Sequence, residues 1–251
     1  MTSFGSVATV ALLLALSASL GCKRTSPATT ASTVDAGSGV QLWPGITEET
    51  IPSPLAIAWT ATWLNGGFAL EPGKLPGHKV REPASCADLE GVAETDVVLG
   101  PGWEHYNFRE KSVRCRVMGR LRTAIAARAG YVRDLVTSDD PGDVLPAAVE
   151  PAPGAAAVAG RSWRAVDPTL KFDRDGARAG FHELIVHGAY RGRLTWWAAG
   201  DVDGDGLEDV VMFSNLAPSG DASSGAPNIM RAFVLTRRQP GGPVTVVERF
   251  E

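Results

Sequence analysis

Residues 196–213 read WWAAGDVDGDGLEDVVMF, an acidic loop between two apolar runs. Leu194–Ala199 and Val210–Phe213 have the length and composition of strands. Between them, five acidic side chains fall within nine residues, and no basic residue separates them. Without a cation these carboxylates would repel one another, so the stretch predicts two strands joined by a metal-binding loop.

The spacing of the acids favours calcium. Ca²⁺ takes six to eight oxygen ligands, and carboxylates at alternate positions can turn inward to supply them. Gly206 permits a sharp turn after the third ligand, and Glu208 is expected to point outward. The predicted ligands are Asp201, Asp203, Asp205, the backbone carbonyl of Leu207, and Asp209.

The loop does not fit an EF-hand, because position twelve is Met212 instead of a bidentate glutamate and the flanks are strands. The pattern D-x-D-x-D-G-x-x-D between two strands resembles the calcium loops of the FG-GAP and VCBS repeat families, which occur in integrin-type β-propellers. The resemblance covers about 20 residues and implies a structural Ca²⁺ that joins consecutive strands. It does not imply a propeller, because the sequence contains no second full copy of the loop.

Further strands follow the same pattern through the C-terminal part. Apolar segments separated by Gly, Asp or Pro turns predict strands at 161–172, 181–188, 193–199, 210–214, 231–236 and 244–250. The N-terminal part predicts helices instead. Ser53-Pro54 begins one over 55–64, and a second runs from Asn107 to Gly130 with an apolar stripe that includes Val113, Val117 and Leu121.

We therefore expect an α+β fold in which a helical N-terminal half packs with a mainly antiparallel β C-terminal half. The predicted organisation is a signal peptide (1–21), a lipid-anchored flexible tether (22–45), a helical region with a disulfide (46–144), a Pro/Ala linker (145–160) and a β region with the calcium loop (161–251).

The N-terminus is typical of an exported protein. Residues 7–20 form an uncharged, mostly apolar run, shorter than the about 20 residues that a transmembrane helix needs. Gly21-Cys22 and then Lys23-Arg24 follow, which resembles a bacterial lipoprotein signal. That resemblance implies a lipid on Cys22 and sorting to the outer membrane or cell envelope. The alternative is an ordinary cleaved signal and a soluble periplasmic or secreted protein.

Export changes the meaning of the remaining cysteines. Without Cys22, the chain has one pair, Cys86 and Cys115. In an oxidising compartment an even pair predicts a disulfide. Two buried thiols are the alternative, and a zinc site is disfavoured because neither a CxxC nor a nearby His pair is present.

Composition narrows the function without naming a partner. A net charge of −4 argues against nucleic-acid binding. No nucleophile elbow, P-loop or dinucleotide fingerprint is present, so nothing positive favours an enzyme. We expect a non-enzymatic binding or interaction module of the envelope with a structural Ca²⁺. Its partners would be the membrane, through the anchor, and a cell-wall polymer, a polysaccharide or another envelope protein.

Two alternatives stay open. One is an enzyme that acts on envelope polymers in a cleft between the two halves, for which His105 or His187 would need a carboxylate partner. The other is a purely structural envelope lipoprotein. A local excess of six positive charges over 108–136 could meet anionic lipid or cell-wall polymer, but a solvated helix face explains it better.

Overall fold

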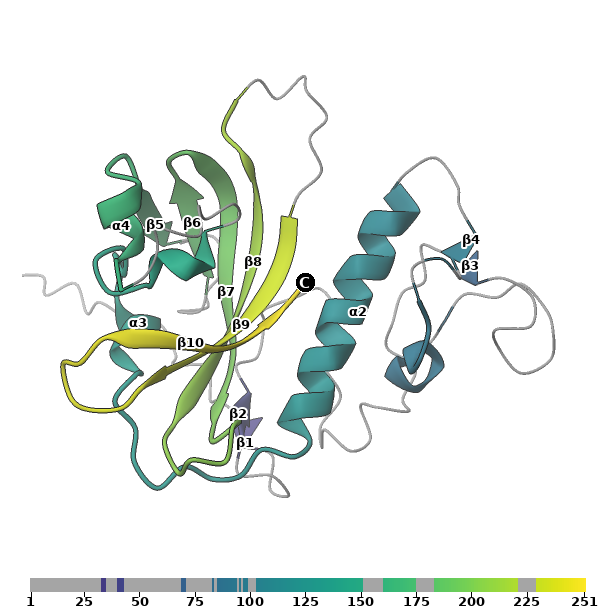
Figure 1. Ribbon diagram of the computed structural model, residues 1–251, viewed down its shortest axis with the longest axis horizontal. Helices are drawn as coiled ribbons and strands as arrows, with labels where there is room; N and C mark the ends of the chain where they lie inside the picture. The colour runs from purple at the N-terminus through teal and green to yellow at the C-terminus, as the bar shows by residue number, and fades with distance from the viewer. Residues whose placement is uncertain are drawn as a thin grey trace, which may run out of the picture.

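The computed structural model describes most of the chain after residue 102 (Figure 1). The described residues are 33–34, 40–42, 69–70, 83, 85–93, 95, 97–98, 103–150, 160–174, 183–220 and 229–251. Their elements are β1 (Thr33–Val34), β2 (Gln41–Leu42), β3 (Ala69–Leu70), η1 (Cys86–Leu89), β4 (Val97–Val98), α2 (Trp103–Leu121), α3 (Asp134–Thr137), η3 (Ala147–Val149), α4 (Trp163–Val166), β5 (Lys171–Arg174), β6 (Glu183–His187), β7 (Tyr190–Gly200), β8 (Asp209–Pro218), β9 (Ile229–Arg237) and β10 (Val244–Phe250). The predicted signal peptide, Cys22 and the predicted helix 55–64 lie outside the described residues.

An eight-stranded antiparallel sheet forms the body of the described chain (Figure 1). Its strands follow the order β1-β2-β7-β8-β9-β10, and β5 and β6 extend it beside β7. The longest pairing joins β7 to β8, from Tyr190↔Pro218 to Gly200↔Asp209. The strands predicted between residues 181 and 250 are confirmed as β6 to β10.

Both faces of this sheet are buried. On β8, Val210 and Met212 belong to one core cluster, whereas Val211 and Phe213 belong to another, because successive side chains of a strand point to opposite faces. None of the four is more than 5% exposed. The run after the acidic loop is therefore apolar at every position instead of at every second one.

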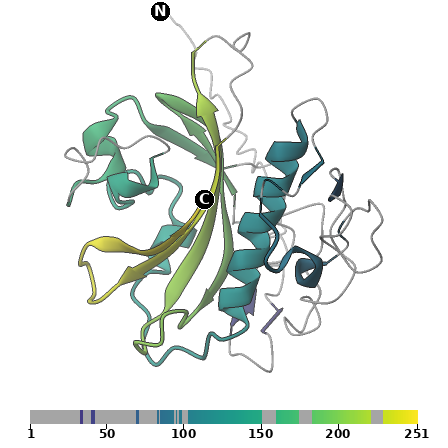
Figure 2. The same cartoon turned by 45° about the vertical axis from the view of Figure 1, so that its right-hand side comes forward.

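Different segments cover the two faces (Figures 1 and 2). The apolar stripe of α2, which includes Val113, Val117 and Leu121, packs in the cluster that contains Val211 and Phe213. The opposite cluster contains Leu135 from α3 and Trp163 from α4. Figure 2 shows α2 on one side of the central strands and the short helices on the other.

The predicted fold class is wrong. The described chain is mainly an antiparallel sheet, and α2 is its one helix longer than four residues, so no helical half packs against a β half. Residues of the N-terminal half also enter the sheet, since β2 pairs with β7 through Gln41↔Ala199 and Leu42↔Ala198. The physical reason is that both sheet faces are apolar: each needs its own cover, and one long helix covers only one of them.

Two predicted connections contain packed residues. The range 22–45, predicted as a tether, includes β1 and β2, which pair with each other, and Val40, which is 0% exposed. The range 145–160, predicted as a linker, begins with Leu145, Ala147 and Val149, all fully buried. Small and branched apolar residues, which resemble a linker in composition, fill the core there instead.

Two predicted elements have different bounds. The helix predicted from Asn107 to Gly130 begins at Trp103 and ends at Leu121. The strand predicted over 161–172 contains α4, because Ser162 Oγ accepts the N–H of Ala165 (3.3 Å) and caps a helical turn. No helix within the described ranges is both long enough and apolar enough to cross a membrane.

A disulfide joins η1 to α2. It links Cys86 and Cys115, the two cysteines that the sequence pairs. Both are buried in the cluster on the α2 side of the sheet. The bond therefore ties residues 86–89 to the helix that covers this face.

Candidate metal centre

The connection from β7 to β8 spans residues 201–208 and is held by hydrogen bonds to its own carboxylates. Asp201 accepts the N–H of Gly204 on Oδ1 (2.8 Å) and the N–H of Gly206 on Oδ2 (2.9 Å). The two glycines have φ of +84° and +89°, a left-handed conformation that side chains with a Cβ rarely adopt. The glycines thus let the backbone fold tightly around Asp201.

Three of the four predicted aspartates come together in this loop. Asp201, Asp203 and Asp209 each place a carboxylate oxygen within 4.8 Å of the other two. Asp201 and Asp209 are buried, whereas Asp203 is exposed, so the group lies at the surface with a buried base. Three converging carboxylates can hold a metal ion, so this group is a candidate metal site.

Asp209 lies deepest in the group. It is 0% exposed, and its Oδ2 accepts the N–H of Val202 (2.8 Å) and of Asp203 (3.3 Å). Its Oδ1 is buried and accepts no hydrogen bond of normal geometry from the described part of the chain; the hydroxyl of Thr236, its partner on β9, is close enough to favour the carboxylate. Burial raises the pKa of Asp209 to about 6, although the N–H of Val202 favours the carboxylate. A buried oxygen of this kind is suited to a cation.

The other predicted ligands are placed differently. Asp205 is exposed and is not part of the carboxylate group; its Oδ1 accepts the N–H of Leu207 (2.8 Å). The carbonyl of Leu207 stays a predicted ligand. Glu208 points away from the group and binds Arg133, whose Nε and Nη2 donate to Glu208 Oε2 (2.7 Å) and Oε1 (2.6 Å). These bonds raise the pKa of Arg133.

A segment far away in the sequence lies against the loop. The N–H of Ile125 donates to the carbonyl of Asp201 (3.0 Å), and the N–H of Asp201 donates back to Ile125 (2.9 Å). The N–H of Glu208 donates to the carbonyl of Ala129 (2.7 Å). Sequence reasoning missed this contact because we expected residues 122–130 to be helical, and no local pattern relates them to the acidic loop.

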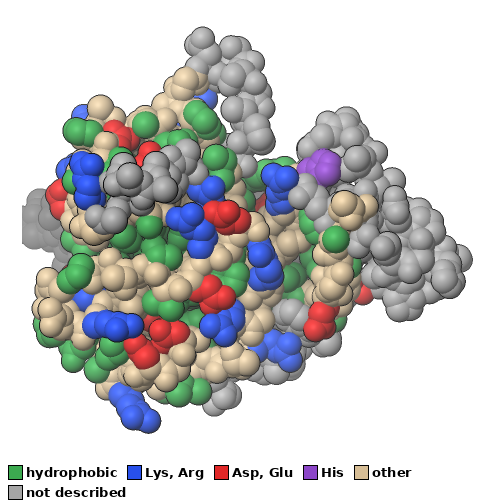
Figure 3. Space-filling model, viewed as in Figure 1, with side chains coloured by type: hydrophobic (Ala, Val, Ile, Leu, Met, Phe, Trp, Pro, Cys, Tyr) green, Lys and Arg blue, Asp and Glu red, His purple; other side chains and the backbone are tan. Residues whose placement is uncertain are grey.

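The basic excess over 108–136 is partly compensated by acids from elsewhere in the fold. Arg120 pairs with Glu248 of β10 (2.7 Å), and Arg133 pairs with Glu208 (2.6 Å). Figure 3 shows Lys and Arg interspersed with Asp and Glu on the face that it presents. On that face the surface is of mixed charge.

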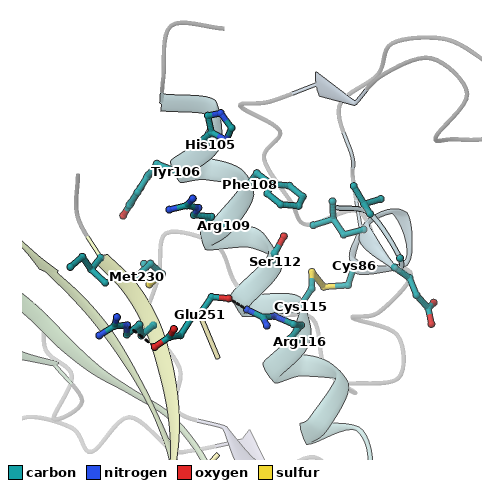
Figure 4. A pocket seen from close by; sticks show the side chains of 16 residues that line it. Cys86, His105, Tyr106, Phe108, Arg109, Ser112, Cys115, Arg116, Met230 and Glu251 are labelled. Atoms are coloured by element: carbon teal, nitrogen blue, oxygen red, sulfur yellow. Dashed lines mark hydrogen bonds and ion pairs between the residues drawn. A yellow bond between two sulfur atoms is a disulfide. The ribbon is translucent and has the colours of Figure 1, made fainter. Parts of the chain in front are cut away.

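A pocket of about 1020 Å³ lies between α2, η1 and the ends of β9 and β10 (Figure 4). His105 and Ser112 line it from α2, and Glu251 lies opposite, in an ion pair with Arg231 (3.1 Å). His187 is not part of its lining; it is exposed on β6, where its Nε2 lies 3.0 Å from Asp173 Oδ2. The pocket and the carboxylate group share no residue.

Comparison with known protein families, with curated proteins and with solved structures finds no match for this chain.

Proposed function

We propose that this protein is an exported, lipid-anchored envelope protein that binds Ca²⁺ structurally and acts as a binding or interaction module. The calcium proposal is supported by the group of Asp201, Asp203 and Asp209, in which Asp209 is fully buried and its Oδ1 accepts no hydrogen bond of normal geometry from a described residue. An unpaired buried carboxylate is costly, and a bound cation offsets that cost.

The chemistry of the donor set favours calcium over other metals. All three grouped side chains are carboxylates, and hard oxygen donors suit Ca²⁺ or Mg²⁺ more than zinc or copper. Ca²⁺ accepts many protein ligands in irregular geometry, whereas Mg²⁺ prefers few protein ligands and keeps its waters. A glycine-rich loop with three to five oxygen donors therefore suits Ca²⁺ better than Mg²⁺.

The position of the loop favours a structural role. It joins β7 to β8, the pair with the longest register in the sheet, and its backbone also bonds to residues 125–129. An ion there would hold two strands and a distant segment together. The strand-loop-strand order agrees with the resemblance to FG-GAP and VCBS loops, which we retain as a proposal.

The proposal of export and anchoring depends on the N-terminal sequence. The apolar run 7–20 followed by Gly21-Cys22 and Lys23 supports a lipid on Cys22 and a location in the outer membrane or envelope. The disulfide between Cys86 and Cys115 supports the same proposal, because disulfides persist in oxidising compartments. The partners we propose are the membrane, through the anchor, and an envelope polymer, a polysaccharide or another envelope protein.

Calorimetric titration of the metal-stripped protein with CaCl₂ tests the calcium site. We expect wild-type protein to bind one Ca²⁺ per chain, Asp203→Asn to lose most of the affinity, and Asp173→Asn, an exposed acid on β5, to bind like the wild type. Asp205→Asn separates the two ligand sets: the geometry predicts a smaller loss than for Asp203→Asn, whereas the sequence pattern predicts similar losses. Absence of any calcium-dependent heat in the wild type would contradict the site.

Mass spectrometry of the mature protein tests the anchor. We expect an acylated N-terminal Cys22 and a membrane-bound protein, and Cys22→Ser should remove both. A mature N-terminus without a lipid would contradict the anchor and leave the calcium proposal intact.

A further inference from the structure

Residues 125–134, which we call the crossing segment, connect the two faces of the sheet. Leu121 and Ala124, just before it, are buried in the cluster on the α2 side. Val132 and Leu135, at its far end, are buried in the opposite cluster. The crossing segment therefore passes around one end of the sheet, at the acidic loop.

Backbone hydrogen bonds join the crossing segment to the acidic loop at both ends of the loop. At the beginning, Ile125 and Asp201 exchange a pair of bonds in a short antiparallel bridge. At the end, the N–H of Arg128 donates to the carbonyl of Gly206 (2.8 Å), and Ala129 pairs with Leu207 in a parallel bridge. The backbone of Asp201, one of the three grouped aspartates, is thus held from outside the loop.

Side chains strengthen this connection. Arg133 holds Glu208, whose side chain is only 11% exposed, with both nitrogen donors of its fork. The next residue, Asp134, accepts a hydrogen bond on Oδ2 from Nη1 of the buried Arg237 (2.6 Å), which anchors the segment to β9. Glu208 directly precedes Asp209, so the position of Glu208 constrains the deepest carboxylate of the group.

The crossing segment approaches Glu208 closely at Gly130. A Cβ added at Gly130 would lie 2.7 Å from Glu208 Oε2 and 3.2 Å from its Cβ. The glycine therefore allows the crossing segment to approach the loop closely enough for the Arg133–Glu208 pair to form.

We propose that the crossing segment is part of the calcium site, with Arg133 as a positioning residue that holds the loop in its metal-binding conformation through Glu208. This inference rests on the calcium proposal above. Because coupling between two events is reciprocal, calcium binding also fixes the crossing segment and, with it, the connection between the two faces of the sheet.

A role through charge alone and a role in positioning make opposite predictions for Arg133→Gln, and this substitution separates the two. If Arg133 acted only through its charge, Arg133→Gln would strengthen Ca²⁺ binding and Glu208→Gln would weaken it. If the pair positions the loop, both substitutions break the two-donor contact and both weaken binding. Groups that orient metal ligands typically change metal affinity by roughly 10–100-fold when removed.

The matched controls are Arg120→Gln and Glu248→Gln, which make the same charge changes in an exposed Arg–Glu pair that does not touch the loop. We expect calorimetric titration with CaCl₂ to show roughly tenfold or greater loss for Arg133→Gln and for Glu208→Gln, and wild-type affinity for both controls. Hydrogen exchange should show that Ca²⁺ slows the amides of Ile125, Arg128 and Ala129 in the wild type and has less effect in Arg133→Gln.

Two results would overturn the inference. One is an Arg133→Gln variant that binds Ca²⁺ as tightly as the wild type or more tightly. The other is wild-type protein that binds Ca²⁺ with no change of exchange at these three amides. Both leave the calcium site itself standing, whereas a wild type that binds no Ca²⁺ removes the site and the inference together.

Discussion

Replacing Asp209 with asparagine should stabilise the metal-free protein and abolish its stabilisation by calcium. In the metal-free protein at pH 8, Asp209 is a charged carboxylate in a fully buried position. Its pKa is raised from 3.8 to about 6, which corresponds to a cost of about 3 kcal/mol for keeping it charged in the folded protein. The asparagine side chain of the variant would carry no charge, and its carbonyl oxygen could still accept the N–H of Val202, as Asp209 Oδ2 does (2.8 Å).

The expected gain for metal-free Asp209→Asn at pH 8 is therefore about 2–3 kcal/mol, or an increase in Tm of about 5–10 °C for a folded part of this size. With Ca²⁺ at a hundred times its Kd, wild-type protein gains about 2.7 kcal/mol, and the variant should gain almost none. Calcium thus removes the difference in stability: the variant is the more stable protein without it, and its advantage is lost when calcium is present.

The pH dependence of metal-free protein gives an independent check. A folded-state pKa above the unfolded value means that the folded protein binds more protons between pH 4 and pH 6. The Asp209 contribution to stability is therefore fully present below about pH 4 and is lost as the pH rises through about 6. Calorimetric melting of metal-stripped protein at pH 8 and pH 5 should show a larger increase on acidification for the wild type than for Asp209→Asn. The reasoning is refuted if the variant melts at or below the wild type at pH 8, or if the two pH slopes are equal.

Three further predictions concern the loop, the two core clusters and the disulfide, and thermal melting tests all of them. Gly206→Ala should destabilise the protein by about 1 kcal/mol or more, because its φ of +89° strains a residue with a Cβ, whereas Gly220→Ala, in open space with no positive φ, should be close to neutral. Met212→Ala and Phe213→Ala should each lower the free energy of unfolding by about 2–5 kcal/mol, because each removes a buried side chain, one from each of the two core clusters. A near-zero cost for one of them would mean that one sheet face is solvated. Cys115→Ala should lower the free energy of unfolding by about 2–5 kcal/mol through loss of the disulfide. Reduction should lower the Tm of the wild type by a similar amount and leave the Tm of the variant unchanged.

The strands between residues 181 and 250 were predictable because each is a short apolar run bounded by Gly, Asp or Pro, and such signals are local. The fold class was not. A run such as Val210–Phe213 is compatible with a strand that is buried on both sides, but the sequence does not say which segments cover the two faces. Leu145 and Val149 show the difficulty, since they lie in a stretch with the composition of a linker and yet are fully buried.

The candidate site was predictable in part for the same reason. The spacing of the acids indicates a metal loop. Glu208 is outside the carboxylate group, but it is buried against Arg133 instead of pointing outward. The selection among the aspartates was not predictable: Asp203 and Asp205 each accept on Oδ1 the N–H of the residue two positions later (3.0 and 2.8 Å), yet only Asp203 joins the group of Asp201 and Asp209. That choice depends on backbone conformation, which the spacing of residue types leaves open.

By itself, the sequence determined the features that neighbouring residues create: the strand pair around the acidic loop, the left-handed turn at Gly206, and the pairing of two cysteines. Only the tertiary structure decided which carboxylates meet, that both faces of the sheet are covered, and that Arg133 reaches Glu208. The physical reason is distance along the chain. Hydrogen bonds between Ile125 and Asp201, or between Arg133 and Glu208, join residues about 75 positions apart, and such contacts form only when the packing of the whole core brings them together.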